Sequence, residues 1–99
     1  MITLYVKSNC QYSAHALAAF DIYNVPFTEK NIADPVAKKE LIEIGGKHKV
    51  PFMVDGDTKL YESEAIVAYI KEHYGQEADE SLHEQVRVFK SSNPDVCAA

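Results

Sequence analysis

The sequence predicts one α/β domain with the element order β-α-β-α-β-β-α and a four-stranded mixed sheet that has helices on both faces. Three observations lead to this prediction. A strand, a helix and a second strand follow one another within about thirty residues, as in a parallel βαβ unit. A second helix with clear start and stop signals comes next. Asp55 and Gly56 then lie between two apolar runs, which indicates a β-hairpin.

The first predicted strand has the pattern of a buried strand. Ile2, Leu4 and Val6 alternate with Thr3 and Tyr5, and β-branched and aromatic residues dominate the run. We expect this strand in the middle of the sheet.

The first helix is predicted for about residues 11–23, where apolar residues recur at helical spacing. We expect Ala14, Leu17 and Ala18 on its buried face. The second strand, 27–32, alternates only imperfectly between apolar and polar residues. This strand is therefore expected on the outside of the sheet.

The second helix has the signals of both ends. Asp34 is the predicted N-cap, and Pro35 is the predicted first helical residue. Ala37, Leu41 and Ile44 form its expected apolar stripe. A Gly-Gly pair follows and predicts the end of the helix, because glycine adopts the positive φ that a helix terminus often requires.

The second half of the domain is predicted as a hairpin and a helix. The strands are expected at 50–54 and 58–61, and Ser63 is the predicted N-cap of the third helix. Four apolar residues form the expected buried face of this helix: Ile66, Val67, Ile70 and Tyr74.

The chain is predicted to divide into a domain at 1–75 and a C-terminal extension at 76–99. We expect the extension to be helical to about residue 90 and frayed from Ser91 onward. The helical pattern is a capping box with an apolar stripe, formed by Ser81, Glu84, Leu82, Val86 and Phe89.

Composition excludes several classes of function. The formal net charge of −5 argues against a nucleic-acid-binding surface, and no apolar run is long enough to span a membrane. The chain enters a strand at once, without a secretory leader, so we expect a cytoplasmic protein. Its two distant cysteines favour a reducing compartment, and a monomer is expected as a separate prediction. His15, His48, His73 and His83 lack the spacing of metal ligands and are expected on the surface.

Cys10 lies where the first strand delivers the chain to a helix. Unpaired backbone N–H groups and the positive end of the helix dipole gather at that point, and both lower the pKa of a thiol. Hydrogen bonds from the N–H groups of Tyr12 and Ser13, and the charge of Lys7, would add to this effect. The alternative is a buried, unreactive cysteine that packs as a small hydrophobe.

The other cysteine, Cys97, lies far away in the sequence, and two such cysteines do not form a disulfide framework. We expect it to be a tail cysteine without a partner. The alternative is a remote resolving thiol for Cys10.

Three motifs carry a family resemblance. The chain resembles the glutaredoxins in Leu4-Tyr5-x-Lys7-x-x-Cys10-x-Tyr12-Ser13, in Val50-Pro51 and in Glu62-Ser63. Its second half is also similar to the glutathione-binding N-terminal domain of glutathione transferases. Both families have the thioredoxin fold, so the resemblance implies that fold for about residues 1–75.

The resemblance implies glutathione-dependent thiol–disulfide exchange. Cys10 would be the nucleophile that takes the glutathionyl group from glutathionylated proteins or small disulfides, and a second glutathione would release it. Lys7, Tyr12 and Ser13 would support this cysteine. The residues implied to bind glutathione are Lys7, Tyr12, Val50, Pro51, Glu62 and Ser63.

Within that implied site, Pro51 corresponds to the cis-proline of the fold. The Val50 backbone would pair with the cysteinyl part of glutathione like an added strand. Ser63 would bind the γ-glutamyl carboxylate, and Lys7 the glycine carboxylate.

The sequence departs from the dithiol glutaredoxins at Ser13, where those proteins have a second cysteine. Only a mechanism that uses one cysteine at this motif therefore remains. Two alternatives stay open: a dimer that holds a [2Fe–2S] cluster through Cys10 and glutathione, and a transferase-like module that binds glutathione or a partner without redox turnover.

Overall fold

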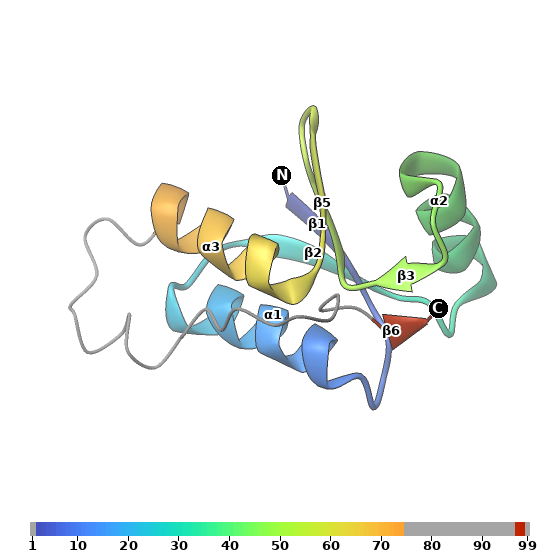
Figure 1. Ribbon diagram of the computed structural model, residues 1–99, viewed down its shortest axis with the longest axis horizontal. Helices are drawn as coiled ribbons and strands as arrows, with labels where there is room; N and C mark the ends of the chain where they lie inside the picture. The colour runs from blue at the N-terminus through green and yellow to red at the C-terminus, as the bar shows by residue number, and fades with distance from the viewer. Residues whose placement is uncertain (1, 75–96, 99) are drawn as a thin grey trace.

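The computed structural model describes residues 2–74 and 97–98, and the structural statements below concern those residues. The main sheet has the strand order β2-β1-β4-β5 (Figure 1). These strands are β1 (Ile2–Val6), β2 (Phe27–Asn31), β4 (Phe52–Asp55) and β5 (Thr58–Tyr61). β1 pairs parallel with β2 and antiparallel with β4, and β5 pairs antiparallel with β4. The predicted mixed sheet, with β1 inside and β2 at an edge, is confirmed.

Within the described residues, three helices cover the two faces of this sheet. They are α1 (Gln11–Ile22), α2 (Pro35–Gly45) and α3 (Ser63–Tyr74). α1 and α3 lie side by side on one face, and α2 lies on the other (Figure 1). The predicted element order is confirmed. None of the described helices is long and apolar enough to cross a membrane.

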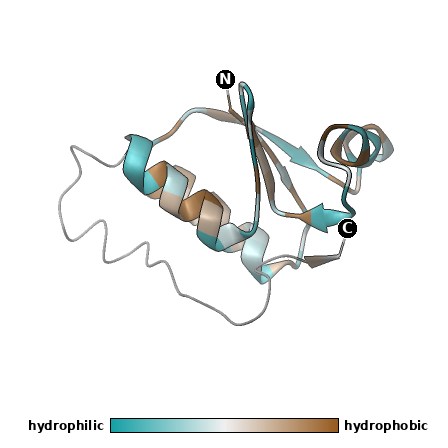
Figure 2. Cartoon of the chain, turned by 45° about the horizontal axis from the view of Figure 1, so that its top comes forward, coloured by the Kyte–Doolittle hydropathy of each residue, from teal (hydrophilic) through white to brown (hydrophobic). Residues whose placement is uncertain are grey.

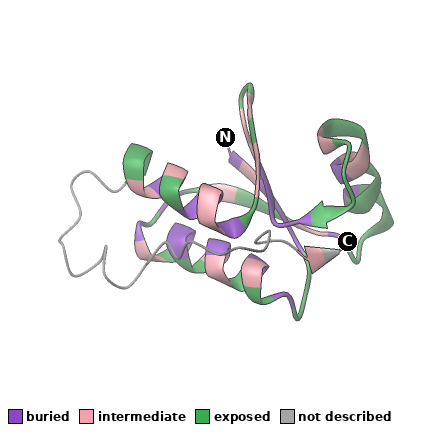
Figure 3. Ribbon diagram, viewed as in Figure 1, coloured by how far each residue is buried: buried purple, intermediate pink, exposed green. Residues whose placement is uncertain are grey.

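Alternation along the strands divides the core into two clusters. Leu4 and its cross-strand partner Met53 face α1 and α3, whereas Tyr5 and its partner Phe52 face α2. The larger cluster contains Ile2, Leu4, Val6, Ala16, Ala19, Phe20, Tyr23, Val25, Met53, Ile66, Val67 and Ile70. The smaller cluster contains Tyr5, Cys10, Ile32, Leu41, Val50 and Phe52. Figure 3 shows the buried residues along β1, which both layers of helices cover.

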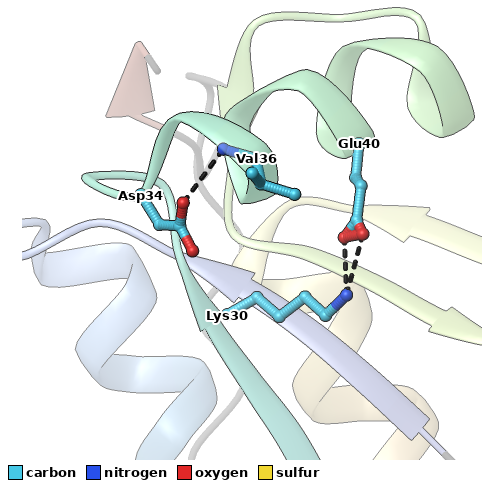
Figure 4. A network of polar contacts seen from close by, with 4 residues as sticks. All are labelled: Lys30, Asp34, Val36 and Glu40. Atoms are coloured by element: carbon cyan, nitrogen blue, oxygen red, sulfur yellow. Dashed lines mark hydrogen bonds and ion pairs between the residues drawn. The ribbon is translucent and has the colours of Figure 1, made fainter.

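Polar contacts attach α2 to the neighbouring strand β2 (Figure 4). Lys30 on β2 contacts both carboxylate oxygens of Glu40 on α2, at 2.5 and 2.9 Å. Asp34 is the N-cap, as predicted, and its Oδ1 accepts a hydrogen bond of 3.0 Å from the N–H of Val36. Gly46 follows the helix with φ 80°, which confirms the predicted glycine terminus.

The predicted buried faces of the helices are partly wrong. In α1 the buried residues are Ser13, Ala16, Ala19 and Phe20. Ala14 and Ala18 are exposed instead, and Leu17 is half-buried. Alanines lie on several sides of this helix, so their spacing does not single out one face.

In α2 and α3 every residue of the predicted stripe is buried except the last. Ile44 and Tyr74 are 41% and 42% exposed, because each lies in the last turn of its helix. Figure 2 shows that hydrophobic and hydrophilic residues are interspersed along α3.

The two described C-terminal residues form a strand. β6 (Cys97–Ala98) pairs antiparallel with β3 (Lys49–Val50) in a separate two-stranded sheet. The expectation of a frayed tail is therefore wrong for these two residues. The predicted helix of the extension, with its capping box, His83 and the glycine after α3, lies outside the described residues, and the division at residue 75 stays a prediction.

Candidate functional site

Cys10 is the N-cap residue of α1, directly after the loop that follows β1. Its backbone is extended, with φ −99° and ψ 115°, and its Sγ accepts a hydrogen bond of 3.4 Å from the N–H of Ser13. The sulfur thus lies at the positive end of the helix dipole. One of the two expected N–H donors, Ser13, is present in this structure.

Ser13 also connects the helix to the preceding loop. Its buried hydroxyl accepts a hydrogen bond of 3.2 Å from the backbone N–H of Lys7, and the N–H of Cys10 donates to the carbonyl of Lys7 at 3.3 Å. Asn9 completes the turn with φ 66°, a conformation that Asn tolerates well. Ser13 therefore fixes the loop that precedes Cys10. It occupies the position at which a Cys-x-x-Cys motif would have its second cysteine.

The sulfur of Cys10 is bonded to that of Cys97 in a disulfide, with the two Cα atoms 6.2 Å apart. The expectation that Cys97 has no partner is wrong. Cys10 itself is only 5% exposed, so in this state it is neither a thiolate nor open to solvent. Long-range pairing of this kind has no local signature in the sequence.

Val50 and Pro51 lie beside this disulfide. The peptide bond between them is cis, as the resemblance implied, and both residues are buried. Val50 is paired with Cys97 across the β3–β6 ladder. The backbone edge expected to bind the cysteinyl part of glutathione therefore carries Cys97 here.

Glu62 and Ser63 begin α3 differently from the prediction. The carbonyl of Glu62 accepts the first helical hydrogen bond, from the N–H of Ile66 at 3.1 Å, so Glu62 holds the cap position and Ser63 is the first helical residue. Ser63 as N-cap is thus wrong by one residue. Glu62 has φ 72°, which is uncommon outside glycine and concentrates at functional sites.

His15 is a residue that the sequence did not single out for this site. Its Nδ1 lies 3.4 Å from the Oγ of the fully buried Ser63, so α1 and the start of α3 meet through these side chains. The expectation that His15 is a plain surface residue is wrong. His48 and His73 are exposed, although the ring of His73 contacts that of Tyr69 at a centroid distance of 4.2 Å.

The smaller core cluster brings together three of the predicted site residues, Cys10, Tyr12 and Val50. Cys10 and Val50 belong to it, and Tyr12 and Cys97 pack against it. Lys7 is exposed at the rim, where it lines an open hollow of about 380 Å³ with Cys10 and the first turns of α1. In the described part of the chain, no group of three His, Cys, Asp or Glu residues is arranged to hold a metal ion.

A family model matches most of the chain. The model described as the N-terminal domain of glutathione S-transferase matches residues 4–78. This range includes every predicted site residue and excludes Cys97.

Solved structures agree with this match. An unclassified glutathione S-transferase from Bombyx mori superposes with a TM-score of 0.68 at 24% identity, covering 77% of this chain and 37% of that one. A delta-class glutathione transferase from Nilaparvata lugens gives 0.68 at 28% identity, covering 84% and 39%. Human glutathione transferase theta-2, solved in complex with glutathione, gives 0.67 at 23% identity, covering 80% and 36%.

These likenesses identify the four-stranded core and its helices as a thioredoxin-like fold. The chain covers less than two fifths of the length of each of these three proteins.

Proposed function

Because the chain belongs to the family of glutathione S-transferase N-terminal domains, we propose that it binds glutathione beside Val50 and Pro51. We further propose a glutaredoxin-like activity in which Cys10 is the nucleophile of glutathione-dependent thiol–disulfide exchange. Such exchange needs a reducing compartment, so the proposed location is the cytoplasm, and the proposed active form is a monomer.

One observation carries this proposal. Cys10 caps α1, and the N–H of Ser13 donates to its sulfur at 3.4 Å. After reduction of the disulfide, the same N–H and the helix dipole would stabilise a thiolate, which is the nucleophilic form of cysteine.

The proposed glutathione site uses the backbone of two elements, β3 and the start of α3. The cysteinyl part would pair with Val50 as an added strand, next to Cys10. The γ-glutamyl carboxylate would bind at the N-terminus of α3, at Ser63, because free N–H groups at a helix start attract anions. The unusual φ of Glu62 supports a functional role for this turn.

The remaining contacts come from side chains near Cys10. Lys7, which is exposed at the rim, would bind the glycine carboxylate of glutathione. Tyr12, which is half-buried and packs against the smaller core cluster, would line the site.

The proposed reaction has two exchange steps. The Cys10 thiolate attacks the glutathionyl sulfur of a mixed disulfide, so that a Cys10–glutathione disulfide forms and the target thiol leaves as a thiolate, which takes up a proton. A second glutathione thiolate then attacks the glutathionyl sulfur on Cys10. Glutathione disulfide forms, and Cys10 is released as a thiolate.

The test is turnover of a glutathionylated peptide by the reduced protein with reduced glutathione present. Cys10→Ser should abolish release of glutathione from the peptide. Ser8→Ala, in the exposed part of the same loop, is the matched control and should retain the activity.

Unchanged turnover in Cys10→Ser would contradict the proposal. If neither the wild-type protein nor Cys10→Ser turns the peptide over but both bind glutathione, the chain is a non-redox glutathione-binding module instead.

A further inference from the structure

We propose that Cys97 and Ala98 form an internal counterpart of the Cys-Gly part of glutathione, and that Cys97 is the second thiol of the exchange reaction. The tail strand β6 would deliver this thiol to Cys10 along the backbone edge that otherwise binds glutathione. This inference rests on the proposed function, and it extends that function from one cysteine to two.

The first support is the register of β6. Cys97 lies opposite Val50, and Ala98 lies opposite Lys49. Val50 is the residue whose backbone is proposed to pair with the cysteinyl part of glutathione. The tail cysteine therefore occupies the position proposed for the cysteine of the tripeptide.

The second support is the direction of the strand. Phe52 pairs with Tyr61, so the start of α3 follows β5 near the Pro51 end of this edge rather than near Lys49. A glutathione with its γ-glutamyl group at Ser63 and its cysteine at Val50 would point its glycine toward Lys49. It would thus run antiparallel to β3, and β6 also runs antiparallel to β3.

The third support is the place of the sulfur. Cys97 is half-buried, packs against the smaller core cluster and is bonded to Cys10. Ser13, where a second cysteine could have resolved the mixed disulfide locally, is instead buried and binds the backbone of Lys7. A resolving thiol for Cys10 must therefore come from elsewhere, and β6 brings one.

The proposed step balances as a thiol–disulfide exchange. The Cys97 thiolate attacks the Sγ of Cys10 in the Cys10–glutathione mixed disulfide. The Cys10–Cys97 bond forms, the bond to glutathione breaks, and glutathione leaves as a thiolate that takes up a proton. Two further glutathione molecules then reduce the protein disulfide and leave as glutathione disulfide, which restores both thiols.

Glutathione and β6 cannot pair with Val50 at the same time. As the sulfur exchange proceeds, the backbone of β6 replaces that of glutathione on the same strand edge. Formation of the Cys10–Cys97 bond therefore both releases glutathione and closes its site.

The test treats the reduced 99-residue chain with oxidised glutathione and follows intact mass and disulfide-linked peptides. The wild-type chain should end as the Cys10–Cys97 disulfide without a stable glutathionyl adduct. Cys97→Ser should keep one glutathionyl group on Cys10. At low reduced glutathione, release of that group should be at least about 100-fold slower in Cys97→Ser than in the wild type, because an intramolecular attack becomes intermolecular.

The outcomes separate this inference from the proposed function. A stable glutathionyl adduct on Cys10 in both proteins overturns the role of Cys97 and leaves the proposed function standing. Absence of any adduct on Cys97→Ser overturns the proposed function, and the resolving step with it. Equal release rates in the two proteins also overturn the role of Cys97.

Discussion

Gly45 lies against Tyr61, close enough that a Cβ at position 45 would overlap the tyrosine hydroxyl oxygen. It would also lie 3.0 Å from the Cζ of Tyr61 and 3.1 Å from that of Phe52. The Tyr61 hydroxyl accepts a hydrogen bond from the N–H of Lys47 and donates one to its carbonyl, both at 3.2 Å. The last turn of α2 and the segment before β3 are thereby attached to β5, so this contact helps to position Val50.

Gly45→Ala should lower the free energy of unfolding by about 1–3 kcal/mol, because the added methyl group must displace packed rings. Alanine is favoured over glycine within a helix by about 1 kcal/mol, so propensity alone predicts the opposite sign. Denaturant unfolding measures the difference. Gly45→Ala combined with Tyr61→Phe should recover part of the loss, and a more stable Gly45→Ala protein would contradict the packing argument.

The positive φ of Glu62 predicts opposite effects of two substitutions. Glu62→Gly should be as stable as the wild type or more so, because glycine adopts φ 72° without a steric penalty. Glu62→Val should lose about 1–2 kcal/mol, the cost of a left-handed conformation for a branched residue. Thermal or urea unfolding of both variants provides the comparison, and equal stabilities would refute a strained cap.

Ser63→Ala should weaken glutathione binding by about threefold to tenfold, because one hydrogen bond contributes about 1 kcal/mol. The N–H groups at the start of α3 remain in this variant, so binding should not be lost completely. Calorimetric titration of reduced protein with glutathione measures the effect.

The control for Ser63→Ala is the rate at which Cys10 reacts with a small alkylating agent. This rate should not change, because Ser63 contacts His15 rather than Cys10. A slower alkylation would mean that the substitution disturbs α1 as well.

Stability should fall at alkaline pH. Burial raises the pKa of Tyr5, Tyr23 and Tyr61 above 10.0. The hydrogen bond to Asp55 raises the pKa of Tyr69, and that to Glu40 raises the pKa of Lys30 above 10.5. The folded state therefore holds these protons more tightly than the unfolded state. The stabilisation is complete below the unfolded pKa values and is lost as the pH rises through the folded ones.

Urea unfolding at about pH 8 and at about pH 11 should show this decrease. Tyr69→Phe, which removes the 2.6 Å hydrogen bond from Tyr69 to Asp55, should reduce it. A free energy of unfolding that is the same at both pH values would contradict the raised pKa values of these groups.

Sequence reasoning succeeded where the signals are local. The Asp34 cap, the Gly46 terminus and the Asp-Gly hairpin each depend on a few neighbouring residues, and these features together imply the element order. It failed where the outcome depends on distant contacts. Ser63 and His15 meet across 48 residues, and Cys10 and Cys97 across 87.

The buried face of α1 could not be predicted for a different reason. A small methyl side chain at four of its positions gives little difference in hydrophobicity between the sides of the helix. Which alanines of α1 are buried is therefore decided by the packing of α1 against α3 and β1.

Cys10 belongs to the smaller cluster, on the α2 side of the sheet, while the buried apolar residues of α3 belong to the larger one. Reduction of the disulfide should therefore change the NMR chemical shifts of the methyl groups of Ile32, Leu41 and Val50. The methyl shifts of Ile66, Val67 and Ile70 should change far less. The molecule thus carries its own spectroscopic indicator of oxidation, with a responsive layer and a reference layer separated by one sheet.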